Sequence, residues 1–259
     1  MKILAFDTSG KAVSVAAAED MRLRSVYWLS HGRTHAEMMM TCIDAVLSGL
    51  NMEPRDFDAF AAITGPGSFT GLRIGIAAVK AMAYACGAGT IGIMTADALA
   101  KNLEGIDNAL ICPLICAKNG YVYQALYRSY KIYDTDESWA NCIVISKNEA
   151  SGNIVVRIAE AEMLTLAAAA ERINLALDEY VSAETVIING DAAEAHYDFF
   201  DAHITNAPCL LAGERDLLQS ASSAALLACE AFAKGRAIPP GRLVPEYLNA
   251  GYFIRGGPA

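Results

Sequence analysis

The order of the apolar segments repeats in the two halves of the chain, and this repeat restricts the fold more than any single motif does. In the first half, three short apolar runs precede an amphipathic segment that begins at Thr34. Thr34 and Glu37 match the capping-box pattern of a helix N-terminus. Strands and helices then alternate along the chain. We expect strands at residues 2–7, 12–18, 23–29, 60–64 and 90–94, and helices from residue 34, at 70–85 and at 97–103.

The second half shows the same order of elements. Asn119-Gly120 is the two-residue sequence that type I′ hairpin turns favour, which predicts a hairpin of two antiparallel strands around it. We expect strands at residues 109–117, 121–132, 142–145 and 185–188, and helices at 159–181, before 203 and at 221–234.

A three-stranded meander followed by alternating helices and strands, present twice, predicts an α/β fold of two ribonuclease-H-like lobes. We place the lobes at residues 1–106 and 107–259 and leave open whether the final helix packs on the first lobe.

The composition excludes disorder and points to a partner. Hydrophobic residues make up 54% of the chain against 19% charged ones, so some apolar surface is expected to meet another molecule. The formal net charge is −9. Because an acidic chain repels phosphate backbones, this protein is a poor candidate for binding nucleic acid by itself.

The start of the chain lacks the pattern of a signal peptide, so we expect a cytoplasmic protein. The longest apolar stretch, residues 74–94, contains Lys80 and two glycines, which favours a buried helix and strand over a membrane span. In that compartment the seven cysteines are expected to be reduced thiols in the core.

A glycine-rich segment, Gly65-Pro66-Gly67-Ser68-Phe69-Thr70-Gly71, follows a predicted buried strand and opens a helix. Such a segment can present backbone N–H groups to a phosphate, or it can be a tight turn that needs glycine for steric reasons. Asp7 ends the first strand, where it could orient a metal–phosphate group or cap its own turn. The candidate phosphate or nucleotide residues are Asp7, Thr8, Gly65, Gly67, Ser68, Thr70, Gly71 and Arg73.

We expect neither a metal site nor catalytic residues. His31 and His35 have the spacing of two helical metal ligands, but His31 precedes the predicted N-cap and cannot share a helix face with His35. Ser68 has no identifiable base, and the sequence lacks the signatures of serine and thiol hydrolases.

The first two long helices are predicted to form a protein interface. The first has a core stripe of Met39, Ile43, Val46 and Leu50 and a second uncharged face, and the second helix is apolar nearly all round. Packing against another protein is one explanation, and coverage by the second lobe is the other. The candidate interface residues are His35, Met38, Cys42, Ala45, Gly49, Ile76, Val79, Lys80 and Ala83.

Three segments together resemble the TsaB (YeaZ) family, bacterial tRNA threonylcarbamoyladenosine biosynthesis proteins once labelled glycoprotease-like. They are Ile3-Leu4-Ala5-Phe6-Asp7-Thr8, Arg33-Thr34-His35, and the glycine segment through Arg73. Later parts of the chain match fewer family landmarks, namely Gly120-x-Val122-Tyr123, Gly190-Asp191 and Pro245-x-Tyr247-Leu248.

The resemblance implies the duplicated fold of the actin and sugar-kinase (ASKHA) superfamily. It further implies a non-catalytic paralogue of TsaD, the enzyme that transfers threonylcarbamoyl to the adenosine beside the tRNA anticodon. The implied partners are a TsaD-like protein in a heterodimer, the ATP-hydrolysing subunit TsaE, a second copy when the chain is alone, and tRNA only through the complex. No membrane association is implied.

The chain departs from the family at its second hairpin, where Cys116-Ala117-Lys118 and Tyr121 replace residues that include two carboxylates in relatives. Their loss leaves nucleotide binding between the lobes open, with weak binding of ATP or ADP and magnesium as the remaining cofactor hypothesis. The alternative functions are a small ATP-dependent kinase or nucleotide hydrolase and a metallopeptidase.

Overall fold

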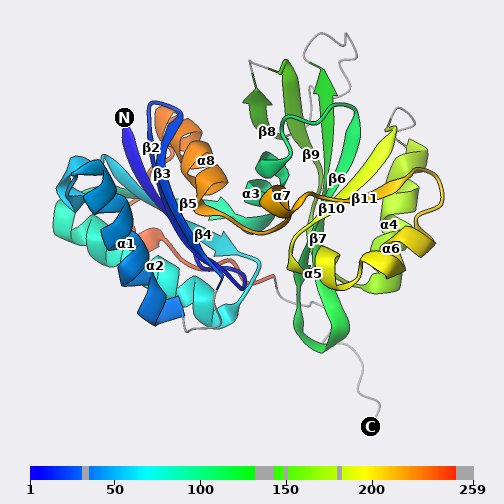
Figure 1. The fold of residues 1–259 in the computed structure, drawn as a ribbon, viewed down its shortest axis with the longest axis horizontal. Coiled ribbons are helices and arrows are strands. Elements are labelled where there is room, and N and C mark those ends of the chain that lie inside the picture. Colours follow the sequence, from blue (N-terminus) through cyan, green and yellow to red (C-terminus); the bar gives the residue numbers. More distant parts are fainter. Residues whose placement is uncertain (31–34, 132–142, 149–150, 180–182, 249–259) are drawn as a thin grey trace.

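A computed structural model describes residues 1–30, 35–131, 143–148, 151–179 and 183–248. Two lobes, each built on one mixed sheet, lie side by side (Figure 1). The first sheet has the order β3-β2-β1-β4-β5, with antiparallel pairing among the first three strands of the chain and parallel pairing of β4 and β5. Its strands are β1 (Lys2–Asp7), β2 (Val13–Glu19), β3 (Arg22–Leu29), β4 (Ala59–Gly65) and β5 (Gly89–Met94).

Helices cover both faces of the first sheet because its strands alternate apolar side chains between the two faces. In β1, Leu4 and Phe6 belong to the cluster under two helices, and Ile3 and Ala5 belong to the cluster on the opposite face. The two helices are α1 (His35–Leu50) and α2 (Phe69–Cys86), with the short turn η1 (Pro54–Asp56) between them. The opposite face is covered by α3 (Thr95–Asn102) and α8 (Ala221–Ala233).

The second sheet has the order β11-β10-β6-β7-β9-β8. Its strands are β6 (Ala109–Cys116), β7 (Tyr121–Lys131), β8 (Ile143–Asn148), β9 (Asn153–Thr165), β10 (Thr185–Asn189) and β11 (Cys209–Leu211). The remaining elements are η2 (Lys118–Gly120), α4 (Leu166–Glu179), α5 (Asp191–Ala195), α6 (Tyr197–His203), α7 (Glu214–Leu217) and η4 (Pro240–Arg242).

The duplication expected from the sequence is confirmed at the level of topology. The order β9-β7-β6-β10-β11 in the second lobe repeats the order β3-β2-β1-β4-β5 of the first, and β8 is an added edge strand. The predicted type I′ turn between β6 and β7 is also present, because Asn119 and Gly120 both have positive φ, at 59° and 76°. The chain therefore has the expected α/β fold of two ribonuclease-H-like lobes.

One predicted helix is wrong in its first third. Residues 159–165 belong to β9 and not to the expected helix 159–181, and α4 begins only at Leu166. The hydroxyl oxygen of Thr165 accepts a hydrogen bond from the Ala168 N–H at 3.2 Å, as at a helix N-cap. Helix propensity is worth only tenths of a kcal/mol per residue, whereas pairing with β7 satisfies the backbone of this segment. The sequence also did not predict β9, β11 and α7. The expected third strand of the second meander, residues 142–145, overlaps the added edge strand β8, and β9 takes the third place beside β7.

Helix α8 belongs in space to the first lobe. Small buried side chains, Ala224, Ala225 and Ala228, let it lie close to β1 and β2. Its first N–H, from Ala221, donates to the Ser14 hydroxyl at 2.7 Å. The chain thus returns from the second lobe to the first before it ends (Figure 1).

The lobes meet around α3. Its Asp97 forms an ion pair with Arg157 of β9 at 2.6 Å and accepts a hydrogen bond from the Tyr127 hydroxyl at 2.7 Å. The side-chain amide of Asn189, at the end of β10, donates to the Leu99 carbonyl at 2.9 Å. Because each of these contacts joins α3 to the second sheet, the relative placement of the lobes depends on this helix.

By length and composition, α2 alone among the described helices could cross a membrane. Core helices of globular proteins meet the same criterion. In this fold Ile76 and Val79 are buried between α2 and the first sheet, and Leu72 is buried in the cluster of the opposite face.

Candidate functional site

The glycine segment forms the sharp turn between β4 and α2. The Ser68 hydroxyl caps α2 by accepting the Gly71 N–H at 3.2 Å. The Ser68 N–H donates to the Ser9 carbonyl at 2.7 Å, which joins this turn to the β1–β2 turn. A Cβ added at Gly67 would lie 2.5 Å from the Ser9 carbonyl oxygen, and one at Gly71 would meet the Thr8 carbonyl oxygen at a still shorter distance. Gly67 and Gly71 therefore allow the backbone of residues 8 and 9 to pack closely against this turn.

Asp7 holds the neighbouring β1–β2 turn. Its buried carboxylate accepts hydrogen bonds from the Ser9 N–H at 2.9 Å and the Ser9 hydroxyl at 2.7 Å. The Thr8 hydroxyl donates to the Gly71 carbonyl at 2.7 Å. These contacts favour the turn interpretation, one of the two that the sequence left open, because the backbone of residues 8 and 9 lies against Gly67 and Gly71.

The second hairpin offers no acidic side chain of its own at Cys116 and Tyr121. The Cys116 N–H donates to the buried carboxylate of Asp191 at 2.9 Å. Cys116 is exposed and not in the core as expected. Partial desolvation at the surface, together with the Asp191 charge, raises the pKa of its thiol to about 11. The thiol is therefore protonated at neutral pH and is a poor nucleophile.

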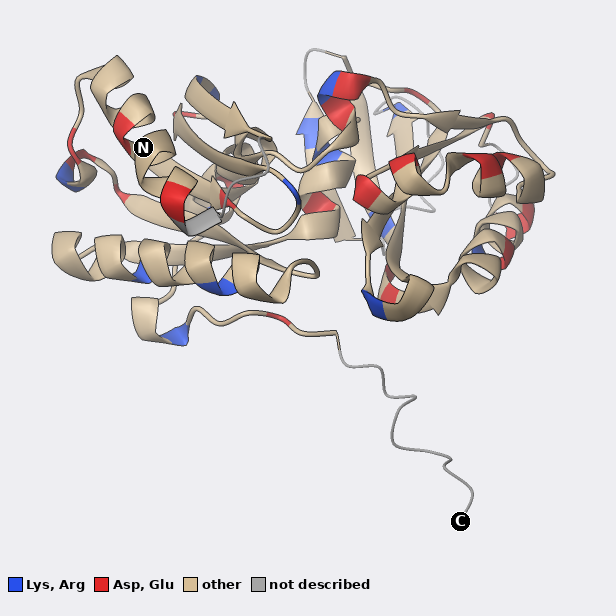
Figure 2. Ribbon diagram, turned by 60° about the horizontal axis from the view of Figure 1, so that its bottom comes forward, with Lys and Arg blue, Asp and Glu red and all other residues tan. Residues whose placement is uncertain are grey.

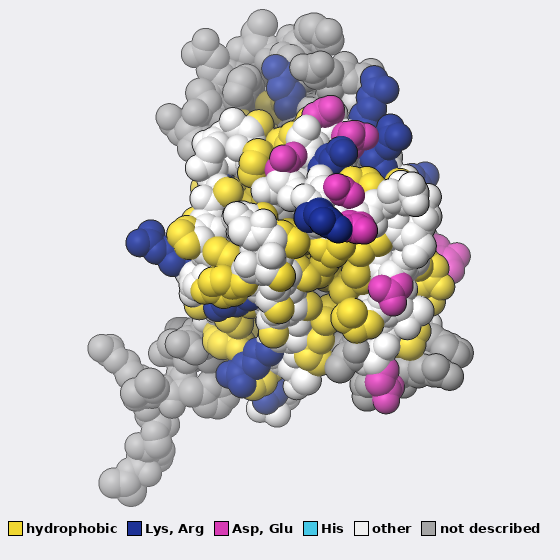
Figure 3. Space-filling model, turned by 90° about the vertical axis from the view of Figure 1, so that its left-hand side faces the viewer, with side chains coloured by type: hydrophobic (Ala, Val, Ile, Leu, Met, Phe, Trp, Pro, Cys, Tyr) yellow, Lys and Arg dark blue, Asp and Glu magenta, His cyan; other side chains and the backbone are white. Residues whose placement is uncertain are grey.

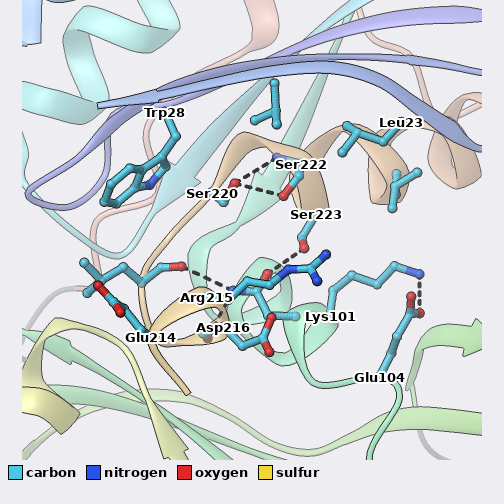
Figure 4. Close-up of a pocket in the computed structure, with 14 residues that line it drawn as sticks. Leu23, Trp28, Lys101, Glu104, Glu214, Arg215, Asp216, Ser220, Ser222 and Ser223 are labelled. Carbon is cyan, nitrogen blue, oxygen red and sulfur yellow. Dashed lines mark hydrogen bonds and ion pairs between the residues drawn. The ribbon is translucent and has the colours of Figure 1, made fainter. Parts of the chain in front are cut away.

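A cavity of about 590 Å³ lies between β3, α3, α7 and α8 (Figure 4). One wall is apolar and includes Trp28, and the opposite wall is polar. Several polar side chains of that wall bond to one another: Ser223 donates to Asn102 at 2.6 Å, and Lys101 forms an ion pair with Glu104 at 2.5 Å. None of the residues singled out from the sequence lines this cavity.

The structure contradicts part of the predicted interface. Cys42, Ile76, Val79 and Ala83 are buried between the helices and the first sheet, so they cannot contact a partner. The helical period identifies which residues share a face but not which face meets the sheet. Of the others, Met38, Ala45 and Lys80 are half-buried and Gly49 is exposed. The His35 side chain and the metal-ligand spacing His31 to His35 lie outside the described residues.

Solvent faces a different set of side chains, which we call the outer face of α1 and α2. Most of these residues were not predicted from the sequence, although those of α2 recur at helical spacing. Its large exposed side chains include Met40, Phe69 and Tyr84, which are 58%, 49% and 64% exposed. Arg73, Ala77 and Ala81 of α2 are also exposed.

Charges border this outer face on both sides. Hydrophobic side chains fill its middle, with acidic side chains to one side and basic ones to the other (Figure 3). The acidic residues of α1 are Glu37 and Asp44, and the basic residues of α2 are Arg73 and Lys80. An apolar seam with opposite charges along its two edges is typical of a helix-packing surface.

The segment after α8, residues 238–248, runs along α2 (Figure 2), and we call it the C-terminal strap. Ile238 pairs with Thr90 at the edge of β5. The Lys80 ammonium donates to the Leu243 carbonyl at 3.2 Å, and the Leu243 side chain is buried in the core under α2. Lys80, predicted as an interface residue, therefore holds the chain's own strap.

A glycine of the first lobe makes room for the strap. Gly65 has φ of +133°, and a Cβ there would lie 2.5 Å from the Glu246 carbonyl oxygen. The Glu246 N–H donates to the Thr64 carbonyl at 2.8 Å, and the Thr64 hydroxyl donates to the Glu246 carboxylate at 3.2 Å.

Two lobes of the same ribonuclease-H-like topology, joined through α3, define an α/β protein of duplicated fold. The family model of TsaD, tRNA N6-adenosine threonylcarbamoyltransferase, matches residues 30–234, and the chain belongs to this family.

The relatives within the family include proteins named TsaB, which confirms the resemblance seen in the sequence. The tRNA threonylcarbamoyladenosine biosynthesis protein TsaB of Bacillus subtilis is 30% identical over 128 residues, 49% of this chain and 56% of that protein. TsaB of Escherichia coli is 33% identical over 129 residues, 49% of this chain and 55% of that protein. The chain thus spans about half the length of these curated relatives.

The solved structure of YeaZ from Pseudomonas aeruginosa superimposes with a TM-score of 0.72. It covers 95% of this chain and 99% of that one at 22% identity, which shows that the two share a fold.

Proposed function

We propose that the chain is a non-catalytic subunit in the biosynthesis of tRNA threonylcarbamoyladenosine, and that it binds a TsaD-like paralogue through the outer face of α1 and α2. Relatives with about 30% identity are named for this biosynthesis, and the matching family model is that of the transferase. In the proposed complex an ATP-hydrolysing third subunit, TsaE, joins the pair. The assembly is cytoplasmic and reaches tRNA through the partners, since this chain carries a net charge of −9.

The observation that supports this proposal most is the outer face itself. Phe69 and Tyr84 lie near opposite ends of α2 and expose about half or more of their surface, with small residues such as Ala77 and Ala81 between them. Small residues let a second helix approach closely, while the aromatic ends supply apolar area to bury. A paralogue of the same fold would present equivalent helices, which gives a four-helix contact.

The charge pattern of the outer face also suits a second copy of the chain when no paralogue is present. In a two-fold arrangement the same patch occurs on both sides, so the acidic edge of one copy meets the basic edge of the other. A homodimer through this face is therefore the expected state of the isolated chain.

The proposal assigns no catalytic residue. Asp7 and Ser68, which a kinase or hydrolase of this fold would need free, hold their own turns through hydrogen bonds. Within the described parts of the chain no group of three or more His, Cys, Asp or Glu side chains is arranged to hold a metal ion.

Introducing a charge at the centre of the outer face tests the proposed interface. Ala81→Glu is expected to weaken binding to the TsaD-like protein of the same cell at least about thirtyfold, because a desolvated, unpaired carboxylate costs roughly 2 kcal/mol or more. The measurement is titration calorimetry with the purified partner, followed by tRNA modification with all subunits present. The melting temperature of the variant should stay unchanged, since Ala81 is exposed.

Leu175→Glu is the matched control. Leu175 is an exposed apolar residue on α4 of the other lobe, so the same charge there should leave binding intact. Binding of the Ala81→Glu chain at wild-type affinity would show that the partner docks elsewhere.

ATP with magnesium is expected to leave the melting temperature of the isolated chain unchanged. The alternative of an ATP-dependent kinase or hydrolase predicts a rise, because a ligand at a hundredfold over its Kd adds about 2.7 kcal/mol of stability. Differential scanning calorimetry with increasing MgATP makes the distinction. A rise of several degrees would favour the alternative and restore a nucleotide site between the lobes.

A further inference from the structure

Three exposed side chains stack at the end of α2 where the strap crosses it. The Arg73 guanidinium lies 3.8 Å above the centre of the Phe69 ring, and its Nε donates to the Tyr247 hydroxyl at 2.9 Å. The Phe69 and Tyr247 rings are 5.1 Å apart. We call this group the strap cluster. It joins the first turns of α2 to the Pro245-x-Tyr247-Leu248 motif of the sequence.

The backbone that carries Tyr247 is held firmly on the first lobe. The residue before it, Glu246, forms the hydrogen bonds to Thr64 described above, and Leu243 is buried under α2. Despite these restraints the Tyr247 side chain is 43% exposed and Phe69 is 49% exposed. The fold therefore orders an aromatic pair at the surface without burying it.

The Arg73 side chain has donors to spare. Its Nε donates to the Tyr247 hydroxyl. Among the residues that the structure describes, its two terminal amino groups form no hydrogen bond or ion pair. These two groups form the fork that binds a carboxylate through two parallel hydrogen bonds. With an aromatic ring beneath it, the guanidinium has reduced contact with water, which strengthens such a bond.

We propose that the strap cluster is the anchor of the partner interface, where Arg73 binds a carboxylate of the docked TsaD-like chain and the two rings bury its flanking apolar side chains. The inference rests on the proposed function and deepens it. Phe69 and Arg73 belong to the outer face of α2, so the cluster is continuous with the proposed docking surface. Glu37 and Asp44 make α1 acidic in this chain, and a partner of the same fold with carboxylates on the equivalent helix would supply the matching charge.

The ordered state of the cluster explains why it would dominate binding. Arginine and tyrosine are enriched among the few residues that carry most of the affinity of an interface. Side chains that are already in their bound conformation lose less entropy on association. The C-terminal strap thus acts as part of the docking surface rather than as a cover over it.

The test compares two exposed residues of the same strap. Tyr247→Ala is expected to weaken binding of the TsaD-like partner at least about tenfold, as truncation of a hot-spot residue does. Val244→Ala is the control, because Val244 is 57% exposed but does not belong to the cluster, and it should change affinity less than about twofold. Tyr247→Phe keeps the ring and loses only the hydroxyl that Arg73 contacts, so an intermediate loss is expected.

Two more variants separate a direct role of the strap cluster in binding from a general effect on the fold of the strap. Arg73→Lys keeps the charge but not the fork, and is expected to weaken binding about tenfold. A chain that ends after Leu248 retains the strap and should bind like the full chain. Thermal melts of all variants should agree with wild type within about two degrees, since the altered side chains are exposed.

The outcomes distinguish this inference from the proposed function. If the full chain binds the partner and Tyr247→Ala binds equally well, the anchor is overturned and the proposed function stands. If Val244→Ala weakens binding as much as Tyr247→Ala does, the strap has only a structural role and the anchor is again overturned. If the full chain does not bind the partner at all, the proposed function and the anchor both fail.

Discussion

Gly71→Ala is expected to lower the free energy of unfolding by about 3 kcal/mol. The added Cβ would collide with the Thr8 carbonyl oxygen, and both atoms belong to backbone that packing holds in place. Because the turns after β1 and β4 meet here, relief of the clash would require the two turns to separate. Urea unfolding followed by circular dichroism measures the loss.

Gly49→Ala is the matched control, because Gly49 is also a helical glycine but an added Cβ there would have open space around it. In α1 this change is expected to stabilise the protein by about 0.5–1 kcal/mol through helix propensity. A Gly71→Ala chain that is as stable as wild type would refute the turn interpretation. The anion-cradle hypothesis, which assigns Gly71 to a ligand rather than to Thr8, would then regain support.

Arg157→Leu is expected to lower the free energy of unfolding by about 3–5 kcal/mol at neutral pH, because it leaves Asp97 partly buried without its counter-ion. Since Asp97 lies on α3 and Arg157 on β9, the loss also loosens the junction of the lobes. The double variant Asp97→Asn with Arg157→Leu should recover most of the stability, because the amide oxygen still accepts the Tyr127 hydroxyl while the buried charge is gone.

The loss in free energy of unfolding caused by Arg157→Leu should increase as the pH rises. Burial raises the pKa of Asp97 above its ordinary value, and the Arg157 charge and the Tyr127 hydrogen bond oppose this rise. Removing Arg157 takes away one of the interactions that lower the pKa of Asp97, so this pKa rises further. A carboxyl whose pKa is higher in the folded state than in the unfolded state loses stability as pH rises between the two values.

The destabilisation by Arg157→Leu is therefore expected to be smaller at pH 5 than at pH 8. Chemical unfolding at the two pH values measures the difference between variant and wild type. An equal cost at both values would mean that Asp97 stays ionised without Arg157 and that water reaches the junction of the lobes.

Elements with a clear local pattern were predictable. β1 has the predicted bounds, and of the predicted core stripe Met39, Ile43 and Val46 are buried, whereas Leu50 at the helix end is half-buried. The reason is that alternation and the helical period are written directly into neighbouring residues. Where local preference and pairing partners disagree, as at residues 159–165, the distant partner β7 decided the outcome.

The candidate site was predictable in location and only partly in detail. The glycine segment and the two long helices do form one continuous region with the strap. However, Cys42 and Val79 face inward, and Lys80 binds the chain's own C-terminal segment. No local pattern records that a stretch near residue 243 lies against α2, because the contact joins positions more than 160 residues apart in sequence.

The amino-acid sequence by itself determined the two-fold order of elements, the family to which the chain is similar and the presence of two unusually apolar helices, since all three are carried by neighbouring residues. Only the tertiary structure decided which side of each helix meets solvent, what fills the space beside the glycines and where Tyr247 lies. These features depend on packing between distant segments, where the free energy of burying a side chain outweighs what its neighbours in sequence prefer.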